Sequence, residues 1–283
     1  MSRHVEIPDT CLHVVERGAD GLPLLILHGG PALDHHMFGD YLDPLGDEFH
    51  LVLVDQRSQG RSDRTPTETW TLERMAADVG ELAEAMGFDR YATLGHSYGA
   101  FVVLQQAVDR PGHAAATIVS SGAPSARYLA AVEDNLAAFE PVELREQVTQ
   151  SWAREQEAQT PEECDALLHD QLPFHFADPR DPRIGEFERR TAGLVWSPDL
   201  LRHFAAAEYG GIEVEDRLGD IPQPVLVLSG RHDRTCVVEA GEAIAAGIPG
   251  AQLVVFEASG HMTYVEENEP YLAAVRRFLQ SVP

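Results

Sequence analysis

The 283-residue chain contains no lysine, so all 21 of its basic side chains are arginines. Chemistry that depends on a lysine amine, such as Schiff-base catalysis or phosphate binding by a P-loop, is therefore excluded. The 21 arginines are outnumbered by 46 aspartates and glutamates, which gives a formal net charge of −25. A chain this acidic repels polyanions, and we expect it to bind neither nucleic acid nor a membrane surface.

Cysteine is also scarce, because the chain has only Cys11, Cys164 and Cys236. They are too few and too widely spaced to indicate a disulfide framework or a zinc site, and we expect no metal and no other cofactor. The sequence has neither the basic and apolar segments of a signal peptide nor an apolar run that could span a bilayer. These absences predict a cytoplasmic protein.

Short apolar runs alternate with helical patterns along most of the chain. The runs occupy residues 4–7, 12–15, 24–27, 51–54, 91–94, 115–120, 225–228 and 253–256. Residues 71–86, 100–107 and 265–279 have the spacing of helices. Strands that alternate with helices indicate an α/β fold, here with a mostly parallel eight-stranded sheet and helices on both faces. The first two runs flank a turn and predict an opening hairpin.

The alternation stops between residues 125 and 209, where the sequence is rich in Glu, Gln and Ala and predicts helices only. The stretch is therefore expected to be a helical insertion after the sixth strand. We therefore predict a catalytic domain of residues 1–124 and 210–283, and an inserted helical cap of residues 125–209.

The pentapeptide Gly95-His96-Ser97-Tyr98-Gly99 lies between a predicted strand and a predicted helix. A G-x-S-x-G motif at such a junction is typical of a nucleophile elbow, a tight turn that exposes the serine hydroxyl at the end of the sheet. Glycine at both ends of the motif permits the strained turn. Ser97 is therefore the predicted nucleophile.

Two further positions supply what a serine nucleophile needs. Asp233 follows the apolar run 225–228, and His261 follows the run 253–256. A serine hydroxyl attacks a carbonyl carbon only if a neutral imidazole takes its proton, and a carboxylate must orient that imidazole. The order Ser, Asp, His along the chain is that of α/β-hydrolases. The sequence therefore predicts a triad of Ser97, Asp233 and His261.

The segment His28-Gly29-Gly30-Pro31 follows the run 24–27, where this architecture places one donor of the oxyanion hole. The second donor is the backbone N–H of the residue after the nucleophile. We expect the N–H groups of Gly30 and Tyr98 to stabilise the charge on the substrate oxygen, each by about 3–4 kcal/mol.

Other ionisable residues near these motifs have structural interpretations. His96 adjoins the nucleophile, but a neighbour on a sharp turn points away from it, so we expect His96 to pack in the core. The pair His35-His36 is not part of a zinc-binding pattern and predicts a solvated helix start. Asp55 follows a predicted strand, and we interpret it as a structural carboxylate that pairs with Arg57 or Arg61.

Four motifs together resemble the proline iminopeptidase group of α/β-hydrolases. They are His28-Gly29-Gly30-Pro31, Asp55-Gln56-Arg57 with Gly60-Arg61-Ser62, the serine elbow, and Gly230-Arg231-His232-Asp233. The resemblance covers roughly residues 1–124 and 210–283. It implies an acyl-enzyme mechanism that uses Ser97, Asp233 and His261 to remove N-terminal residues from short peptides. It also implies that Glu208 receives the amine of the substrate.

Two departures from that group keep a second activity open. The group typically has glycine after His-Gly-Gly-Pro, where this chain has Ala32, and its elbow is typically Gly-Gly-Ser-Trp-Gly. The elbow of this chain is similar to those of esterases and lactonases with the same fold. The alternative is therefore a carboxylesterase or lactonase that cleaves small acyl esters. In both cases a short peptide or other small molecule is the expected partner.

Two other classes of protein use the same fold. Dehalogenases and epoxide hydrolases need a carboxylate at the nucleophile position, which Ser97 argues against. A non-catalytic binding protein could retain the fold, but an intact triad makes an enzyme the stronger prediction.

Overall fold

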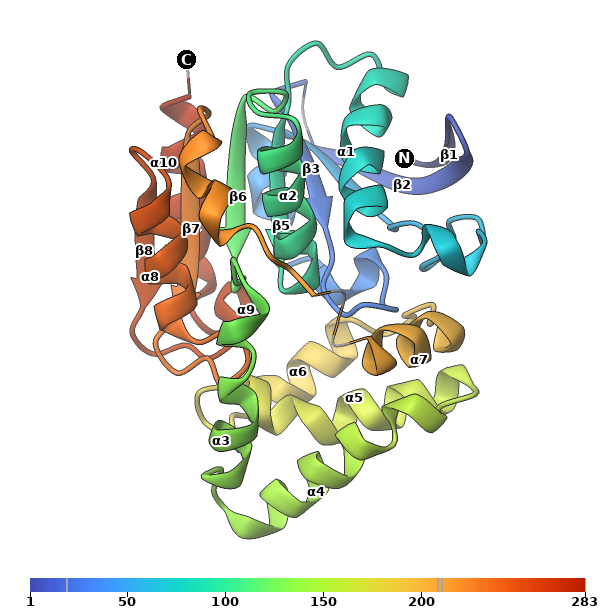
Figure 1. Ribbon diagram of the computed structural model, residues 1–283, viewed down its shortest axis with the longest axis vertical. Helices are drawn as coiled ribbons and strands as arrows, with labels where there is room; N and C mark the ends of the chain where they lie inside the picture. The colour runs from blue at the N-terminus through green and yellow to red at the C-terminus, as the bar shows by residue number, and fades with distance from the viewer. Residues whose placement is uncertain (19, 208, 210, 283) are drawn as a thin grey trace.

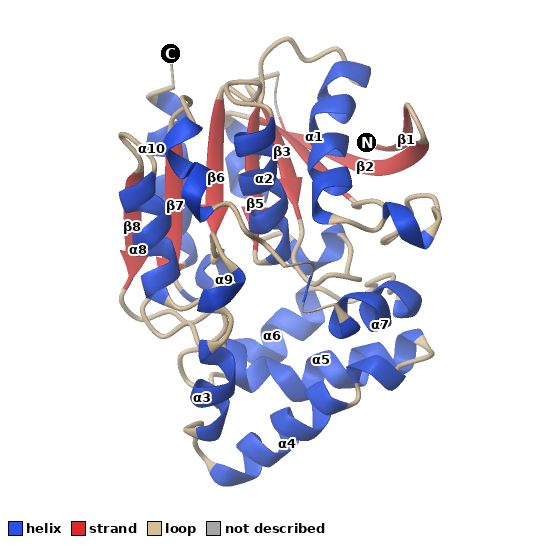
Figure 2. Cartoon of the chain, in the orientation of Figure 1, coloured by secondary structure: helices blue, strands red, loops and turns tan. Residues whose placement is uncertain are grey.

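The computed structural model describes residues 1–18, 20–207, 209 and 211–282. It contains one eight-stranded sheet in the order β1-β2-β4-β3-β5-β6-β7-β8 (Figure 2). The strands are β1 (Ser2–Ile7), β2 (Thr10–Gly18), β3 (Pro23–Leu27), β4 (His50–Val54), β5 (Ala92–His96), β6 (Ala116–Ser120), β7 (Val225–Gly230) and β8 (Gln252–Phe256). β1 and β2 form the predicted hairpin, and β2 also pairs with β4 in antiparallel orientation. The remaining neighbours in the sheet, from β4 through β3, β5, β6 and β7 to β8, all pair in parallel orientation. The predicted, mostly parallel sheet is therefore confirmed.

The central strands have no solvated face. Every residue of β5, β6 and β7 is buried, as is every residue of β3 and β4 except the first. Parallel strands of this kind need helices on both faces to cover them. Helices α1 (Leu72–Ala85) and α2 (Tyr98–Asp109) lie in front of the sheet in Figure 1. Helices α8 (Val238–Gly247) and α10 (Asn268–Gln280) contact β7.

The sequence predicts one closing helix over residues 265–279, but the structure has two helices there. The chain forms the short helix α9 (Thr263–Glu266), leaves helical geometry at Glu267, and then begins α10. Pro270 explains the break, because proline has no N–H to donate to the carbonyl of Glu266 four residues earlier. That carbonyl accepts a hydrogen bond from Arg183 instead.

The described residues between β6 and β7 contain helices and no strand. The α-helices there are α3 (Ala131–Ala137), α4 (Val142–Ala153), α5 (Pro161–His175), α6 (Arg183–Arg190) and α7 (Pro198–Ala206). They gather beyond the end of the sheet toward which the parallel strands point (Figures 1 and 2). We call this group of helices the cap; the domain boundaries given above remain a prediction. Across the described residues, every helix is too short or too polar to cross a membrane.

A buried ion pair fixes α1 to the loop after β4. The guanidinium of Arg57 is fully buried and donates to both carboxylate oxygens of Asp78, at 2.8 and 2.6 Å. It also donates to Asp9 at 2.7 Å. The predicted pairing of Arg57 with Asp55 is therefore wrong, because the guanidinium turns toward α1.

We predict that Asp78→Asn lowers the free energy of unfolding by about 3 kcal/mol, because it leaves the buried Arg57 charge poorly compensated. Urea unfolding of the purified variant measures this loss. The matched control is Asp109→Asn, which breaks the more exposed pair with Arg217 and should cost less than about 1 kcal/mol. Equal losses in the two variants would contradict the role assigned to the Arg57–Asp78 pair.

Candidate active site

Ser97 lies on a strained turn between β5 and α2. Its backbone has φ 56° and ψ −119°, in the region that side chains rarely adopt. The two motif glycines are needed because the chain folds tightly back on itself: a Cβ on Gly95 would lie 2.0 Å from the carbonyl oxygen of Gly99, and one on Gly99 would lie 2.3 Å from that of Leu27. The turn thus has the geometry of a nucleophile elbow. His96 is fully buried, as predicted.

His261 and Asp233 are brought together by the loops after β8 and β7. Nδ1 of His261 lies 2.8 Å from Oδ2 of Asp233, and both side chains are almost fully buried. The other carboxylate oxygen, Oδ1, accepts hydrogen bonds at 2.9 Å from the backbone N–H groups of Thr235 and Cys236 and from the Thr235 hydroxyl. Burial raises the pKa of Asp233, but the facing His261 and these donors outweigh it and hold the pKa below its ordinary value.

A large cavity lies between the sheet and the cap, and both Ser97 and His261 line it. Its volume is about 730 Å³, and Ser97 is partly exposed there. Most of the wall is apolar and comes from the cap and from segments that follow strands of the sheet, including Met37, Phe101, Leu136, Trp152, Leu172 and Trp196. Ser97 and His261, two of the three predicted triad residues, therefore reach one cavity. The third, Asp233, is bonded to His261 and does not line the cavity.

The two predicted oxyanion donors also lie at this cavity. Gly30 has φ +110° and lines the cavity with Tyr98. Tyr98 is the first residue of α2, and the first N–H groups of a helix have no acceptor within it. The loop that carries Gly30 runs beside the elbow, since a Cβ on Gly29 would lie 2.9 Å from Cβ of Ser97.

Comparison with known proteins shows the family to which this fold belongs. Residues 23–268 match the family described as alpha/beta hydrolase fold. The chain belongs to this family. A proline iminopeptidase of Heyndrickxia coagulans is 26% identical over 277 residues, which are 94% of this chain and 93% of that protein. The structure of a proline iminopeptidase of Mycobacterium smegmatis has a TM-score of 0.77 at 24% identity. The match covers 99% of this chain and 98% of that protein's chain. The structure of an esterase of Exiguobacterium antarcticum also has a TM-score of 0.77, at 22% identity. This match covers 99% of this chain and 100% of the esterase chain.

The cap of this α/β-hydrolase contributes a buried carboxylate that the sequence did not reveal. Glu155 is 5% exposed and lines the cavity. It accepts a hydrogen bond from Nε2 of Gln171 at 2.7 Å and another from the hydroxyl of Tyr209. Burial raises the pKa of Glu155, although both donors act in the opposite direction. Glu208, the predicted partner of a substrate amine, lies outside the described residues.

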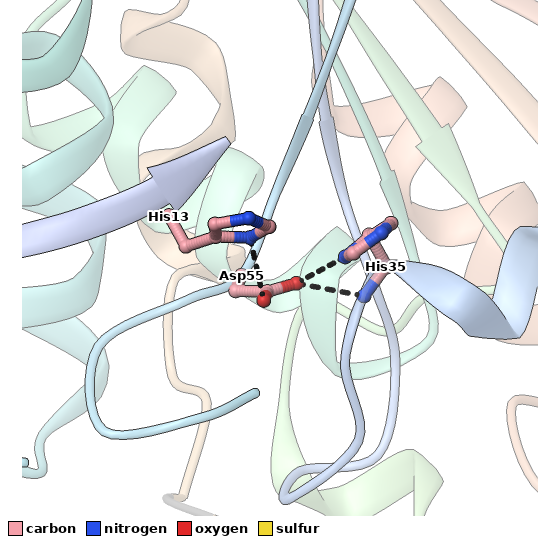
Figure 3. A group of neighbouring side chains, drawn as sticks. All are labelled: His13, His35 and Asp55. Carbon is pink, nitrogen blue, oxygen red and sulfur yellow. Dashed lines mark hydrogen bonds and ion pairs between the residues drawn. The ribbon is translucent and has the colours of Figure 1, made fainter. Parts of the chain in front are cut away.

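A second buried carboxylate, Asp55, is bonded to two histidines (Figure 3). Its Oδ1 accepts hydrogen bonds from the backbone N–H of His35 at 3.0 Å and from its Nδ1 at 2.6 Å. Its Oδ2 accepts from Nδ1 of His13 at 3.0 Å and from the backbone N–H of Arg61 at 2.9 Å. The structural interpretation of Asp55 is correct, but its side-chain partners are histidines and not arginines. The predicted solvated position of His35 is wrong, because this bond buries its ring.

His13, His35 and Asp55 are residue types that bind metals, and their ligand atoms lie within 4.8 Å of one another. Each oxygen of Asp55, however, already accepts two hydrogen bonds, which use its lone pairs. A metal would have to displace these donors, two of which are backbone N–H groups. The donor set therefore fits a hydrogen-bonded structural carboxylate that joins strand β2, the segment at His35 and the loop after β4.

A third buried carboxylate, Glu266, connects the loop of His261 to the cap. Its Oε2 accepts from the backbone N–H of Gly260 and its Oε1 from that of Ala177, both at 2.8 Å. Burial raises the pKa of Glu266 to about 7, although both N–H donors lower it. The group therefore keeps its proton in the folded protein at a pH where an exposed glutamate has lost it.

We predict that Glu266 makes the protein less stable as the pH rises from about 4.5 to about 7. In this window the folded state binds more protons than the unfolded chain, so the free energy of unfolding falls with increasing pH, in total by about 3 kcal/mol. Glu266→Gln should flatten this decline, and urea unfolding at several pH values measures it. The exposed Glu269→Gln is the control. A Glu266→Gln curve parallel to that of the unmodified protein would contradict the assignment.

Proposed function

We propose that this α/β-hydrolase is a serine hydrolase that acts through an acyl-enzyme. Ser97 is the nucleophile, His261 is the general base, and Asp233 orients His261. The observation that supports this assignment most is that Ser97 and His261 line one cavity while His261 is bonded through Nδ1 to a buried carboxylate. That bond keeps the proton on Nδ1 and leaves Nε2 free to accept another.

In the proposed reaction, the hydroxyl oxygen of Ser97 attacks the carbonyl carbon of the substrate as its proton passes to Nε2 of His261. The N–H groups of Gly30 and Tyr98 stabilise the oxyanion that forms. The tetrahedral intermediate then expels its amine or alcohol, which takes the proton from His261. A water molecule then gives a proton to His261 and attacks the acyl carbon. The bond from that carbon to the Ser97 oxygen breaks, the acid is released, and His261 returns the proton to Ser97.

Removal of N-terminal residues from short peptides, as in proline iminopeptidases, is the proposed activity. The Heyndrickxia coagulans relative carries that name and aligns over nearly its full length. The amine of such a substrate is a cation, and a cation in a largely apolar cavity needs a carboxylate partner to offset its loss of water. Among the described residues of the cap, Glu155 offers such a carboxylate. We assign to Glu155 the binding of the substrate amine, the role that the resemblance gave to Glu208.

A carboxylesterase or lactonase is the second candidate, favoured by the apolar character and the size of the cavity. An uncharged acyl ester gains from burial against apolar side chains and needs no carboxylate. The same Ser97, Asp233 and His261 would serve both reactions, so the nature of the substrate depends on the cap.

We predict that Ser97→Ala lowers kcat by about a thousandfold or more, because it removes the nucleophile with little change in volume. Hydrolysis of p-nitrophenyl acetate and of proline arylamide measures the loss, and the melting temperature should stay the same. A fluorophosphonate should add its mass to the peptide that contains Ser97. Retention of a tenth of the activity in the variant would rule out Ser97 as nucleophile.

We predict that Glu155→Gln raises KM for proline arylamide by about ten- to a hundredfold, because it removes the charge that binds the amine. Hydrolysis of the neutral acetyl ester should be almost unchanged. Glu157→Gln changes an exposed glutamate in the same turn and serves as the control. No effect on either substrate would favour the esterase or lactonase, and equal loss on both would indicate a general defect of the cavity.

A further inference from the structure

The last turn of the cap helix α5 ends against the residue that follows the triad carboxylate. Nη1 of Arg234 donates to the carbonyl oxygens of Phe174 and Phe176, at 3.1 and 2.6 Å. Nη2 donates to the carbonyl oxygen of Ala177 at 3.0 Å. The last carbonyls of a helix have no donor within it, and the helix dipole makes this end negative. A guanidinium is suited to such a site because it carries five N–H donors and a fixed positive charge.

The loop of His261 contacts the same turn from another direction. The backbone N–H of His261 donates to the carbonyl oxygen of His175 at 2.7 Å. The approach is close enough that a Cβ on Gly260 would lie 2.6 Å from that oxygen. The carbonyls of residues 174–177 therefore all accept hydrogen bonds from the two loops that carry Asp233 and His261.

Arg234 is itself held by the cap. Its guanidinium carbon lies 5.0 Å from the ring centre of Phe139 and 5.9 Å from that of Phe174, two members of a small apolar cluster within the cap. Nδ2 of Asn135, on α3, donates to its backbone carbonyl at 3.0 Å. A single side chain therefore joins the core of the cap to the loop next to Asp233.

We propose that Arg234 is a positioning residue, which holds the end of α5 so that the cap sets the relative placement of Asp233 and His261. The proposal rests on the proposed function of these two residues. Because the N–H of His261 is anchored on α5, a shift of that turn moves the base relative to Ser97. The cap is then part of the device that aligns the catalytic groups, in addition to forming the cavity.

The test compares Arg234→Ala with Arg180→Ala, which removes an exposed arginine just beyond the same turn. Arg234→Ala should lower kcat by about ten- to a hundredfold, the effect expected of a small misplacement of a catalytic group, with KM changed much less. Millimolar guanidinium chloride should restore part of the lost kcat. Arg180→Ala should show neither effect. Arg234→Lys keeps the charge with fewer donors, and its kcat should lie between that of Arg234→Ala and that of the unmodified protein. This variant tests the proposal if Arg234→Ala does not fold.

Amide hydrogen exchange provides a readout that needs no substrate. In Arg234→Ala or Arg234→Lys, peptides that contain residues 172–178 and 256–262 should exchange faster than in the unmodified protein, since both belong to the contact. Unchanged exchange in the second peptide would overturn the proposal, as would a lower melting temperature with unchanged kcat. A protein with coupled exchange but no hydrolase activity would overturn the proposed function instead.

Discussion

Buried carboxylates that accept backbone N–H groups hold together the loops at the carboxyl end of this sheet. Asp55 binds the N–H groups of two different loops, and Glu266 binds one from the cap and one from the loop of His261. Asp233 binds two N–H groups of its own loop and also His261. Loops without regular structure have buried donors that no neighbouring strand satisfies, and a carboxylate accepts several of them at once. The strongly acidic composition thus has a structural use within the fold as well as on its surface.

The sheet, the helices that cover it and the elbow could be predicted from the sequence because their signals are local. Helix α1 follows from Thr71, whose side chain caps it, and from the regular spacing of buried residues such as Met75 and Val79. The elbow follows from Gly95 and Gly99, because only glycine permits the close approach of backbones seen there. The break before α10 is also encoded locally, in Pro270, although the apolar spacing continues across it.

The errors concern contacts between segments distant in the sequence. His35 was expected in solvent because no metal-binding pattern surrounds it in the sequence, yet it is bonded to an aspartate 20 residues away. Glu155 resembles any other acidic residue of a polar helical segment until α5 and the end of the cap bring Gln171 and Tyr209 to its carboxylate. Helical spacing shows which elements exist, but it does not show which of their faces meet.

The anchoring of the cap at the end of α5 means that two parts of the cap are constrained in different ways. Residues 174–177 are tied by their backbone carbonyls, so an insertion or deletion there would move these acceptors away from their donors. Helices α3 and α4 meet the cavity through side chains such as Leu136 and Trp152. Substitutions of these side chains would change the shape of the cavity. Chain length is therefore constrained where the cap meets the sheet loops, whereas the form of the cavity is set by side chains on α3 and α4.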